Sequence, residues 1–244
     1  MDGSISGETA YNTDPYPSGK MGVSLTLVEK LQRAVKMARD NKLQLAVHAM
    51  GDKAIQTVID VTKEIAPWLT TMPSVRIEHA SLMTDQMFAE IANSKMNYAL
   101  VTQPIFFFAE DESYRHYLSP AQFKLAYRVK TMLNSQAMLG LSSDAPCTPW
   151  AEPDSPFYSI YAAVTRKAAN GDVVNAEEAI TVPQAILGYT RDGAKIGGFD
   201  ENGTLEVGKA ADFVILNDDI FTVAHSELKN IHVNETWMAG KRVM

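Results

Sequence analysis

The sequence is short of the residues that would place the protein in several large classes. Its 244 residues include one cysteine, Cys147, so no disulfide can form within the chain. No run of about 18 apolar residues is present, which excludes an ordinary membrane-spanning helix. Lys and Arg number 22 against 29 Asp and Glu, and the net charge of −7 argues against a nucleic-acid-binding surface. Residues 1–6 lack the basic and apolar regions of a signal peptide, so we expect a cytoplasmic protein that binds neither membrane nor nucleic acid.

The composition is otherwise that of a globular protein with a sizeable core. Hydrophobic residues make up 46% of the chain and charged residues 21%, and this length suits one large domain or one domain with an appendage. Apolar β-prone runs alternate with helical patterns, and strands are predicted up to His48, over 75–79, over 96–103 and over 137–143. Strand–helix alternation of this kind predicts an α/β fold with a parallel sheet and helical crossovers.

Helices are predicted between these strands from their apolar spacing and end signals. The predicted helices are 24–41 with Ser24 as cap, 53–66 capped by Asp52, 84–93 capped by Thr84, 119–134 opened by Ser119 and Pro120, 155–171, 176–180 and 182–191. Residues 1–23 and 105–118 are predicted loops, the latter because Pro104 stops the preceding strand. Near residue 195 the pattern changes to glycine turns and β-prone runs. We therefore expect an α/β part over 1–195 and a small β appendage over 196–244.

Three polar residues stand where predicted strands end: His48, His79 and Asp144. The carboxyl ends of parallel strands meet at one rim, which is the catalytic face of α/β barrels. Two imidazoles and a carboxylate are also the ligands that zinc and similar divalent metals take. Each residue alone has a plainer interpretation, since a histidine at a strand end is more often structural and an aspartate there is usually a turn or cap. Their repeated placement favours a functional site.

Three motifs carry a resemblance to a known family. Residues 48–52 read HAMGD, 76–80 read RIEHA and 142–146 read SSDAP. With these motifs in this order the chain resembles the amidohydrolase superfamily, in the branch that contains N-substituted formamide deformylase. Residues 2–4 and the tail 203–216 fit the same branch. The resemblance implies a metal-dependent hydrolase, acting mostly on C–N bonds in amides, formamides and related small molecules. It also implies a (β/α)8 TIM-type barrel with a small β-sandwich built from both chain ends.

The resemblance also implies roles for individual residues. His48 matches the histidine that closes strand 5 of the barrel and His79 the one that closes strand 6, and both are metal ligands in the family. Asp144 matches the strand 8 aspartate, which is a metal ligand and the catalytic proton acceptor. The implied cofactor is a divalent metal ion, with zinc expected, because such a metal lowers the pKa of its water toward about 7. The implied partner is a small-molecule substrate, whose identity the sequence does not give.

The chain departs from the family pattern on its N-terminal side. The family carries a His-x-His pair on strand 1 and often a carboxylated lysine before the Asp-Gly-Ser element, whereas only Met1 precedes Asp2 here. The histidines stand at 48, 79, 116, 225 and 232, so no two are two apart. We therefore expect the C-terminal half of the barrel, strands 5–8 with their helices, plus part of the β-sandwich, and at most one metal ion. The alternative is a catalytically inactive fragment, or a subunit that needs a separate N-terminal half.

A half-barrel has exposed sheet edges. Its first and last strands each present a row of unpaired N–H and C=O groups. We also expect Val47, Ile77 and Leu141 to face the missing opposite wall and to form an exposed apolar patch. Such a chain is predicted to self-associate or to pair with an N-terminal half, unless residues 1–23 cover one edge.

Three further features have two interpretations each. Cys147 lies three residues after Asp144 and is expected near the mouth of the site, but a nucleophilic role would need an activating partner. His116 is expected to be a solvated loop residue, with substrate contact as the alternative. Residues 106–108 are three phenylalanines that are expected to cover the core, with pocket lining as the alternative.

Overall fold

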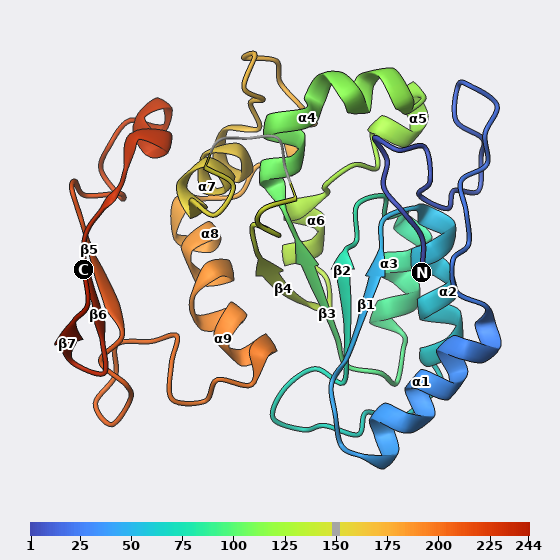
Figure 1. Ribbon diagram of the computed structural model, residues 1–244, viewed down its shortest axis with the longest axis horizontal. Coiled ribbons are helices and arrows are strands. Elements are labelled where there is room, and N and C mark those ends of the chain that lie inside the picture. Colours follow the sequence, from blue (N-terminus) through green and yellow to red (C-terminus); the bar gives the residue numbers. More distant parts are fainter. Residues whose placement is uncertain (148–151) are drawn as a thin grey trace.

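Two β-sheets form the framework of the protein. The computed structural model describes residues 1–147 and 152–244. The first sheet has four parallel strands in the order β1-β2-β3-β4, and the second has three antiparallel strands in the order β5-β6-β7 (Figure 1). The strands are β1 (Leu45–Ala49), β2 (Val75–His79), β3 (Tyr98–Thr102), β4 (Met138–Leu141), β5 (Phe213–Leu216), β6 (Val233–Met238) and β7 (Lys241–Arg242). The predicted α/β arrangement with a parallel sheet is confirmed.

Helices flank the parallel sheet on the side of β1 and beyond β4. They are α1 (Val28–Asp40), α2 (Asp52–Thr62), α3 (Asp85–Ala92), α4 (Pro104–Tyr117), α5 (Pro120–Phe123), α6 (Val129–Leu133), α7 (Pro156–Thr165), α8 (Val182–Tyr189) and α9 (Arg191–Gly197), with 3₁₀ turns η1 (Ala176–Glu178) and η2 (His225–Asn230). Figure 1 shows α1, α2 and α3 beside β1 and β2, and α8 and α9 beside β4. Within residues 1–147 and 152–244, none of these helices is long and apolar enough to cross a membrane.

One face of the parallel sheet packs against the helices. Val47 pairs with Ile77, and Ile77 pairs with Leu100, in a row across three strands. All three are buried, and they share one core with Ile55 and Ile59 of α2. Burying an aliphatic side chain of this size stabilises the folded state by about 1.5–3 kcal/mol. This shared core holds the strands in the register that places their carboxyl ends at one edge.

The prediction that Val47, Ile77 and Leu141 face an open barrel interior is wrong. Their exposed fractions are 8%, 0% and 5%, and they lie in the core beneath the helices. Side chains alternate along a strand, so their neighbours His48 and Glu78 point to the opposite face, where both are partly exposed. Apolar character alone did not distinguish the helix-facing residues from the others.

Helix α9 covers the opposite face of the sheet near β4. Ile196 is 2% exposed and packs with Val101 in a second, small apolar cluster. A Cβ added at Gly140 would lie 2.9 Å from the Ile196 Cδ1, so this close approach explains a glycine in the middle of a strand. On β2 the same face carries Arg76 and Glu78, which form an ion pair and remain partly exposed.

The predicted loop over 105–118 is a helix instead. Pro104 occupies the first turn of α4, where a missing backbone N–H costs nothing, so it opens a helix as well as ending β3. Residues 106–108 are buried, as expected of residues that cover the core, and Phe106 also lines a cavity, which is the alternative interpretation. At Glu110 the backbone leaves helical geometry, with φ −123° and ψ 19°, and the helix is kinked there.

Two shorter helices replace the single helix predicted over 119–134. Ser119 forms a capping box with Gln122, so the predicted helix start is correct. The chain then turns at Tyr127, which adopts φ +50° and donates its N–H to the Ser81 carbonyl oxygen at 2.9 Å. This contact with a distant segment overrides the local helical pattern.

Of the three side-chain caps predicted for the first helices, the structure confirms the one at Thr84, which caps α3. Ser24 does not cap α1, which begins at Val28. Asp52 is the first residue of α2 rather than its cap, and its carboxylate accepts the Thr13 N–H at 2.8 Å. That bond ties the N-terminal segment to α2, a tertiary use that competes with capping.

The later helices are shorter than predicted. The helix expected over 155–171 ends at Thr165, because Arg166 adopts the left-handed conformation with φ +56°. The helix expected over 182–191 is divided into α8 and α9 at Thr190, whose φ of −114° and ψ of −93° are not helical.

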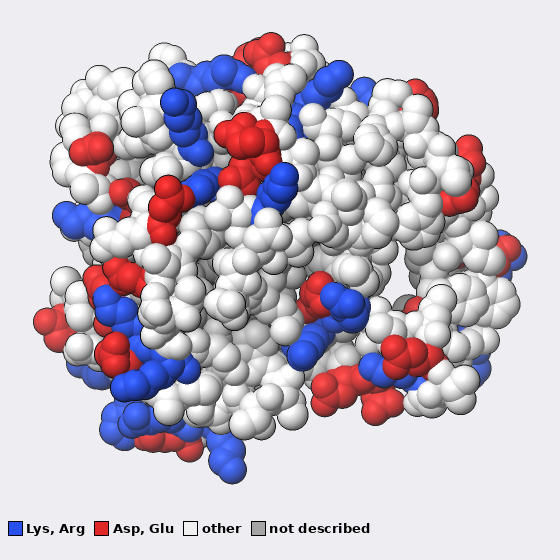
Figure 2. Space-filling model, turned by 180° about the vertical axis from the view of Figure 1, so that it is seen from behind, with Lys and Arg blue, Asp and Glu red and all other residues white. Residues whose placement is uncertain are grey.

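Charged side chains of both signs are interspersed over the back of the molecule (Figure 2). Several form ion pairs with neighbours, as Lys63 does with Glu90 and Lys95 does with Glu64. Solvent-exposed pairs of this kind contribute roughly 0–1 kcal/mol each. We interpret them as parts of a solvated surface.

Candidate active site

The N-terminal segment lies across the carboxyl end of β1. The Asp2 carboxylate is 4% exposed and accepts three backbone N–H groups at 2.8–3.1 Å. The donors belong to Tyr11, Met50 and Gly51. Hydrogen bonds to an ionised acceptor are roughly twice as strong as neutral ones. Asp2 therefore fixes this segment over the loop that follows β1.

His48 is oriented by the same segment. Its Nε2 lies 3.1 Å from the Gly3 carbonyl oxygen and 3.4 Å from Asp2 Oδ1. The pKa of His48 is raised because its ring N–H donates to the Asp2 carboxylate, and partial burial opposes that rise. Within residues 1–147 and 152–244 the Nδ1 of His48 makes no hydrogen bond. The ring is thus held through one nitrogen and keeps the other available.

Asp2 is a positioning residue that the strand and helix patterns did not single out. The only signal was its place in the family element at residues 2–4, since an isolated acidic residue has neither periodicity nor ligand spacing. Its role depends on the fold, which brings it next to a strand that ends more than forty residues later.

Replacing Asp2 with asparagine is expected to lower the pKa of His48, because the neighbouring negative charge is lost. Asp2 raises the pKa of His48 in the folded state. The interaction between the two therefore makes its full contribution to the free energy of unfolding at pH values below the pKa of His48 in the unfolded chain, about 6.5. The contribution is lost as pH rises through the folded value. An NMR titration of the His48 ring checks the pKa, and unfolding at several pH values checks the linkage.

Asp14→Asn is the matched control, since Asp14 is exposed in the same segment. An unchanged His48 titration in Asp2→Asn would mean that the carboxylate does not act on the ring.

His79 is held more firmly than His48. It is 7% exposed, and its Nδ1 lies 2.9 Å from Gln103 Oε1. The Gln103 amide in turn donates to Ser142 Oγ at 2.8 Å. The ring stacks on Phe106, with 5.8 Å between centroids. Burial lowers the pKa of His79, and the charge on His48 lowers it further. A neutral imidazole with Nε2 available is the form that binds a metal.

The backbone departs from ordinary conformations at two of the predicted site residues. His79 and Asp144 have φ values of +68° and +51°, and Ala80 follows His79 with φ +47°. Non-glycine residues rarely adopt positive φ, and such conformations cost of order 1–3 kcal/mol each. They persist where surrounding structure enforces them, often at functional sites.

The structure brings the three predicted site residues to one cavity. His48, His79 and Asp144 line a space of about 490 Å³, together with residues 4–6 and with Phe106, Glu110 and Tyr114 of α4. The two imidazole rings lie 4.5 Å apart between centroids and meet edge to face at 72°. A cavity of this volume is in the range that accommodates small-molecule ligands.

These residues fit a divalent metal in the kind of donor that they offer. Imidazole nitrogens and a carboxylate are zinc ligands, and histidine ligands usually have their second nitrogen held by a hydrogen bond. Within residues 1–147 and 152–244, no group of three or more His, Cys, Asp or Glu side chains is arranged to hold a metal ion. The described part of the chain thus offers ligands of the right kind without enclosing a complete metal site.

Of the other candidate site residues, Cys147 lines the cavity and the three remaining histidines do not. Cys147 is exposed and lines the same cavity, as its place in the sequence predicted. His116 is an exposed residue near the end of α4, with its ring edge-on to Tyr117, and the predicted loop there is wrong. His225 and His232 are exposed in the C-terminal part.

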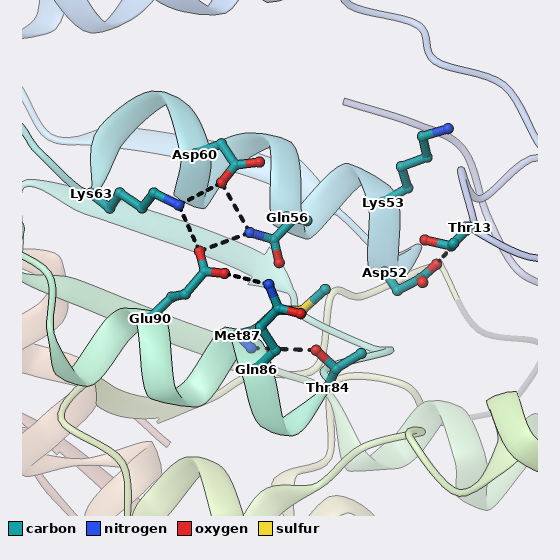
Figure 3. Close-up of a pocket in the computed structure, with 10 residues that line it drawn as sticks. All are labelled: Thr13, Asp52, Lys53, Gln56, Asp60, Lys63, Thr84, Gln86, Met87 and Glu90. Atoms are coloured by element: carbon teal, nitrogen blue, oxygen red, sulfur yellow. Dashed lines mark hydrogen bonds and ion pairs between the residues drawn. The ribbon is translucent and has the colours of Figure 1, made fainter.

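A second cavity, of about 360 Å³, lies between α2 and α3 (Figure 3). Lys63 pairs with Asp60 and Glu90 at 2.8 Å each, and Gln86 donates to Glu90 at 2.7 Å. Figure 3 shows these side chains pointing toward one another. Because they satisfy each other, we interpret this cavity as a solvated ion-pair network.

Sequence comparison decides the family. The family model described as the amidohydrolase family matches residues 1–244. The chain belongs to the amidohydrolase family. YtcJ of Bacillus subtilis, named for a proposed amidohydrolase activity, is 30% identical over 99% of this chain and 45% of its own length. The N-substituted formamide deformylase of Arthrobacter pascens is 28% identical over 81% of this chain and 36% of its own length. The resemblance carried by the three motifs is thereby confirmed.

A solved structure extends the comparison of this amidohydrolase-family chain. An uncharacterized metal-dependent hydrolase from Pyrococcus horikoshii has a TM-score of 0.78 and 31% identity, over 92% of this chain and 44% of that one. The chain thus spans less than half the length of the relatives that it matches.

Proposed function

We propose that this chain supplies the C-terminal half of a metal-dependent hydrolase that cleaves C–N bonds in amides, formamides or related small molecules. One observation supports the proposal above all. His48, His79 and Asp144 come from the ends of three parallel strands and line one cavity. In a parallel barrel this edge is the catalytic face.

The proposed fold is half of a (β/α)8 barrel with part of a β-sandwich. Residues 1–195 would form the partial barrel, with β1 to β4 as its strands 5–8, and residues 196–244 part of the sandwich. The strands run parallel in sequence order, as in a barrel. The share of the relatives' length that the chain covers, 36–45%, fits the same proposal.

His48 through Nδ1, His79 through Nε2 and the Asp144 carboxylate are the groups of this chain that would hold the metal, with zinc expected. When bound, the metal would supply Lewis-acid activation of water and of the substrate carbonyl. Gln103 keeps the His79 ring in one orientation through Nδ1. The Asp144 carboxylate accepts a proton from the attacking water and delivers it to the leaving nitrogen. Phe106 forms part of the apolar wall of the cavity.

The remaining ligands would come from outside the described residues. The proposal therefore includes assembly, with a second copy or a separate N-terminal half, since β1 and β4 are both edge strands. The second candidate function is an inactive fragment or subunit. No three His, Cys, Asp or Glu side chains in residues 1–147 and 152–244 are already arranged around a metal position, and this favours the second candidate for the isolated chain.

The purified chain is expected to bind zinc weakly and to hydrolyse N-benzylformamide at least about a thousandfold more slowly than the Arthrobacter deformylase, because loss of essential groups costs rates of this order. Calorimetric titration with zinc chloride and chromatographic detection of benzylamine measure the two properties. Robust zinc-dependent turnover that His48→Ala abolishes would show that the site of this chain is complete. A chain that binds no zinc would contradict the proposed metal site.

A further inference from the structure

Besides Asp144, Glu110 is the one acidic residue among the described residues that line the cavity of His48 and His79. It lies on α4, where the kink breaks helical geometry at Glu110 itself. Its Oε2 accepts a hydrogen bond of 2.6 Å from Ser6 Oγ, a residue of the N-terminal segment. The carboxylate is therefore fixed at the cavity wall by two elements far apart in sequence.

This carboxylate has no basic partner within the described part of the chain. Its neighbour Asp111 pairs with Arg115 at 2.8 Å, whereas Glu110 forms no ion pair and its Oε1 no hydrogen bond. It is half-buried, and burial raises its pKa despite the hydrogen bond from Ser6. A desolvated carboxylate of this kind gains most from a ligand that brings a positive charge or an N–H donor.

The rest of the cavity wall has the same preference. Apart from the two histidines, which are proposed to hold the metal, the described lining residues include no basic side chain that would pair with a substrate carboxylate or phosphate. Apolar surface comes from Ile5, Met50 and Phe106. A metal bound at the histidines would add positive charge at that end of the cavity. Glu110 is then the group that would discriminate between charges on the part of the substrate that lies away from the metal.

We propose that Glu110 makes the site selective for substrates with an ammonium or N–H group next to an apolar group, and against substrates with an anionic group there. This inference rests on the proposed function, because it names the substrate class of the same cavity. The chemical class is an amide or formamide of an amine that carries a second nitrogen donor or cation. Glu110 binds this part of the substrate and takes no part in bond cleavage.

Binding of three small probes to the full chain tests the proposal: benzylamine as cation, benzyl alcohol as neutral analogue and phenylacetate as anion. Calorimetry at about pH 8 keeps a carboxylate ionised and an alkylamine protonated. The wild-type chain is expected to bind benzylamine most tightly. Glu110→Gln should weaken benzylamine about tenfold, the effect of one charge-assisted hydrogen bond, and leave benzyl alcohol unchanged. The titrations are repeated in the presence of zinc. Direct contact between the amine and the metal would be the same in wild type and in Glu110→Gln, so a difference between the two reports on Glu110.

Glu112→Gln is the matched control, because Glu112 is exposed on the same helix and does not line the cavity. If Glu110→Gln fails to fold, Ser6→Ala replaces it, and loss of the hydrogen bond to Glu110 should weaken benzylamine binding alone. Equal binding of phenylacetate and benzylamine by the wild-type chain overturns the proposal. Unchanged benzylamine affinity in Glu110→Gln, or in Ser6→Ala where that variant replaces it, overturns it as well. Loss of zinc binding with an intact amine preference would instead overturn only the proposed function.

Discussion

Replacing His79 with alanine is expected to weaken zinc binding by the purified chain at least about a hundredfold. Loss of an outer-shell partner of a metal ligand typically costs ten- to a hundredfold, and loss of the ligand itself costs more. His79 is the better-prepared of the two histidines, because it is buried, stacked on Phe106 and hydrogen-bonded to Gln103. Competition with a chromogenic zinc chelator measures the affinity of wild type and variant.

His116→Ala is the control for this experiment. His116 is an exposed histidine of the same chain that lies outside the cavity lining, so its removal should leave zinc affinity unchanged. Equal zinc affinity in His79→Ala and wild type would remove His79 from the site. A large loss in His116→Ala would mean that zinc binds at the surface.

The second large effect concerns assembly. The purified chain is expected to associate at micromolar concentration, since the described residues place no strand beyond β1 or β4. Next to the C-terminal sheet lies an apolar groove of about 650 Å³. Leu205, Val214 and Phe221 in its lining are 76%, 49% and 62% exposed. Exposed apolar surface of this extent usually marks an interface. We expect a second copy of the chain to cover it in the purified protein.

Sedimentation over a concentration series measures this association. Phe221→Asp should raise the dissociation constant of this association at least about tenfold. Burying an unpaired carboxylate at the interface costs more free energy than a tenfold change in that constant represents. Phe199→Asp is the matched control, since Phe199 is 63% exposed but does not line the groove. A compact wild-type monomer at all concentrations would show that edges and groove need no partner.

The parallel sheet could be predicted because its signals are local. Each strand is a short apolar run that ends at a polar residue and a turn, and these runs keep their identity in the fold. Helix α4 was missed because proline ends a strand and opens a helix equally well. The break at Tyr127 depends on the distant Ser81 carbonyl oxygen, which no local pattern reveals.

The candidate site was predictable to a similar extent. His48, His79 and Asp144 follow from their positions at strand ends, and the structure places them at one cavity. Glu110 could not be found, because its stretch was interpreted as a loop and its orientation depends on a helix kink. Asp2 is predicted only as part of a motif, since its role arises from three backbone N–H groups, two of which belong to Met50 and Gly51 in the turn after β1.

His48, His79 and Asp144 are proposed to bind one metal ion together. Anomalous diffraction at the zinc absorption edge, from crystals of the chain grown with zinc, tests this claim most directly. We predict one anomalous peak in the cavity, about 2.0–2.2 Å from His48 Nδ1, His79 Nε2 and an Asp144 oxygen. A cavity without a peak, or zinc bound only at other residues, would contradict the claim.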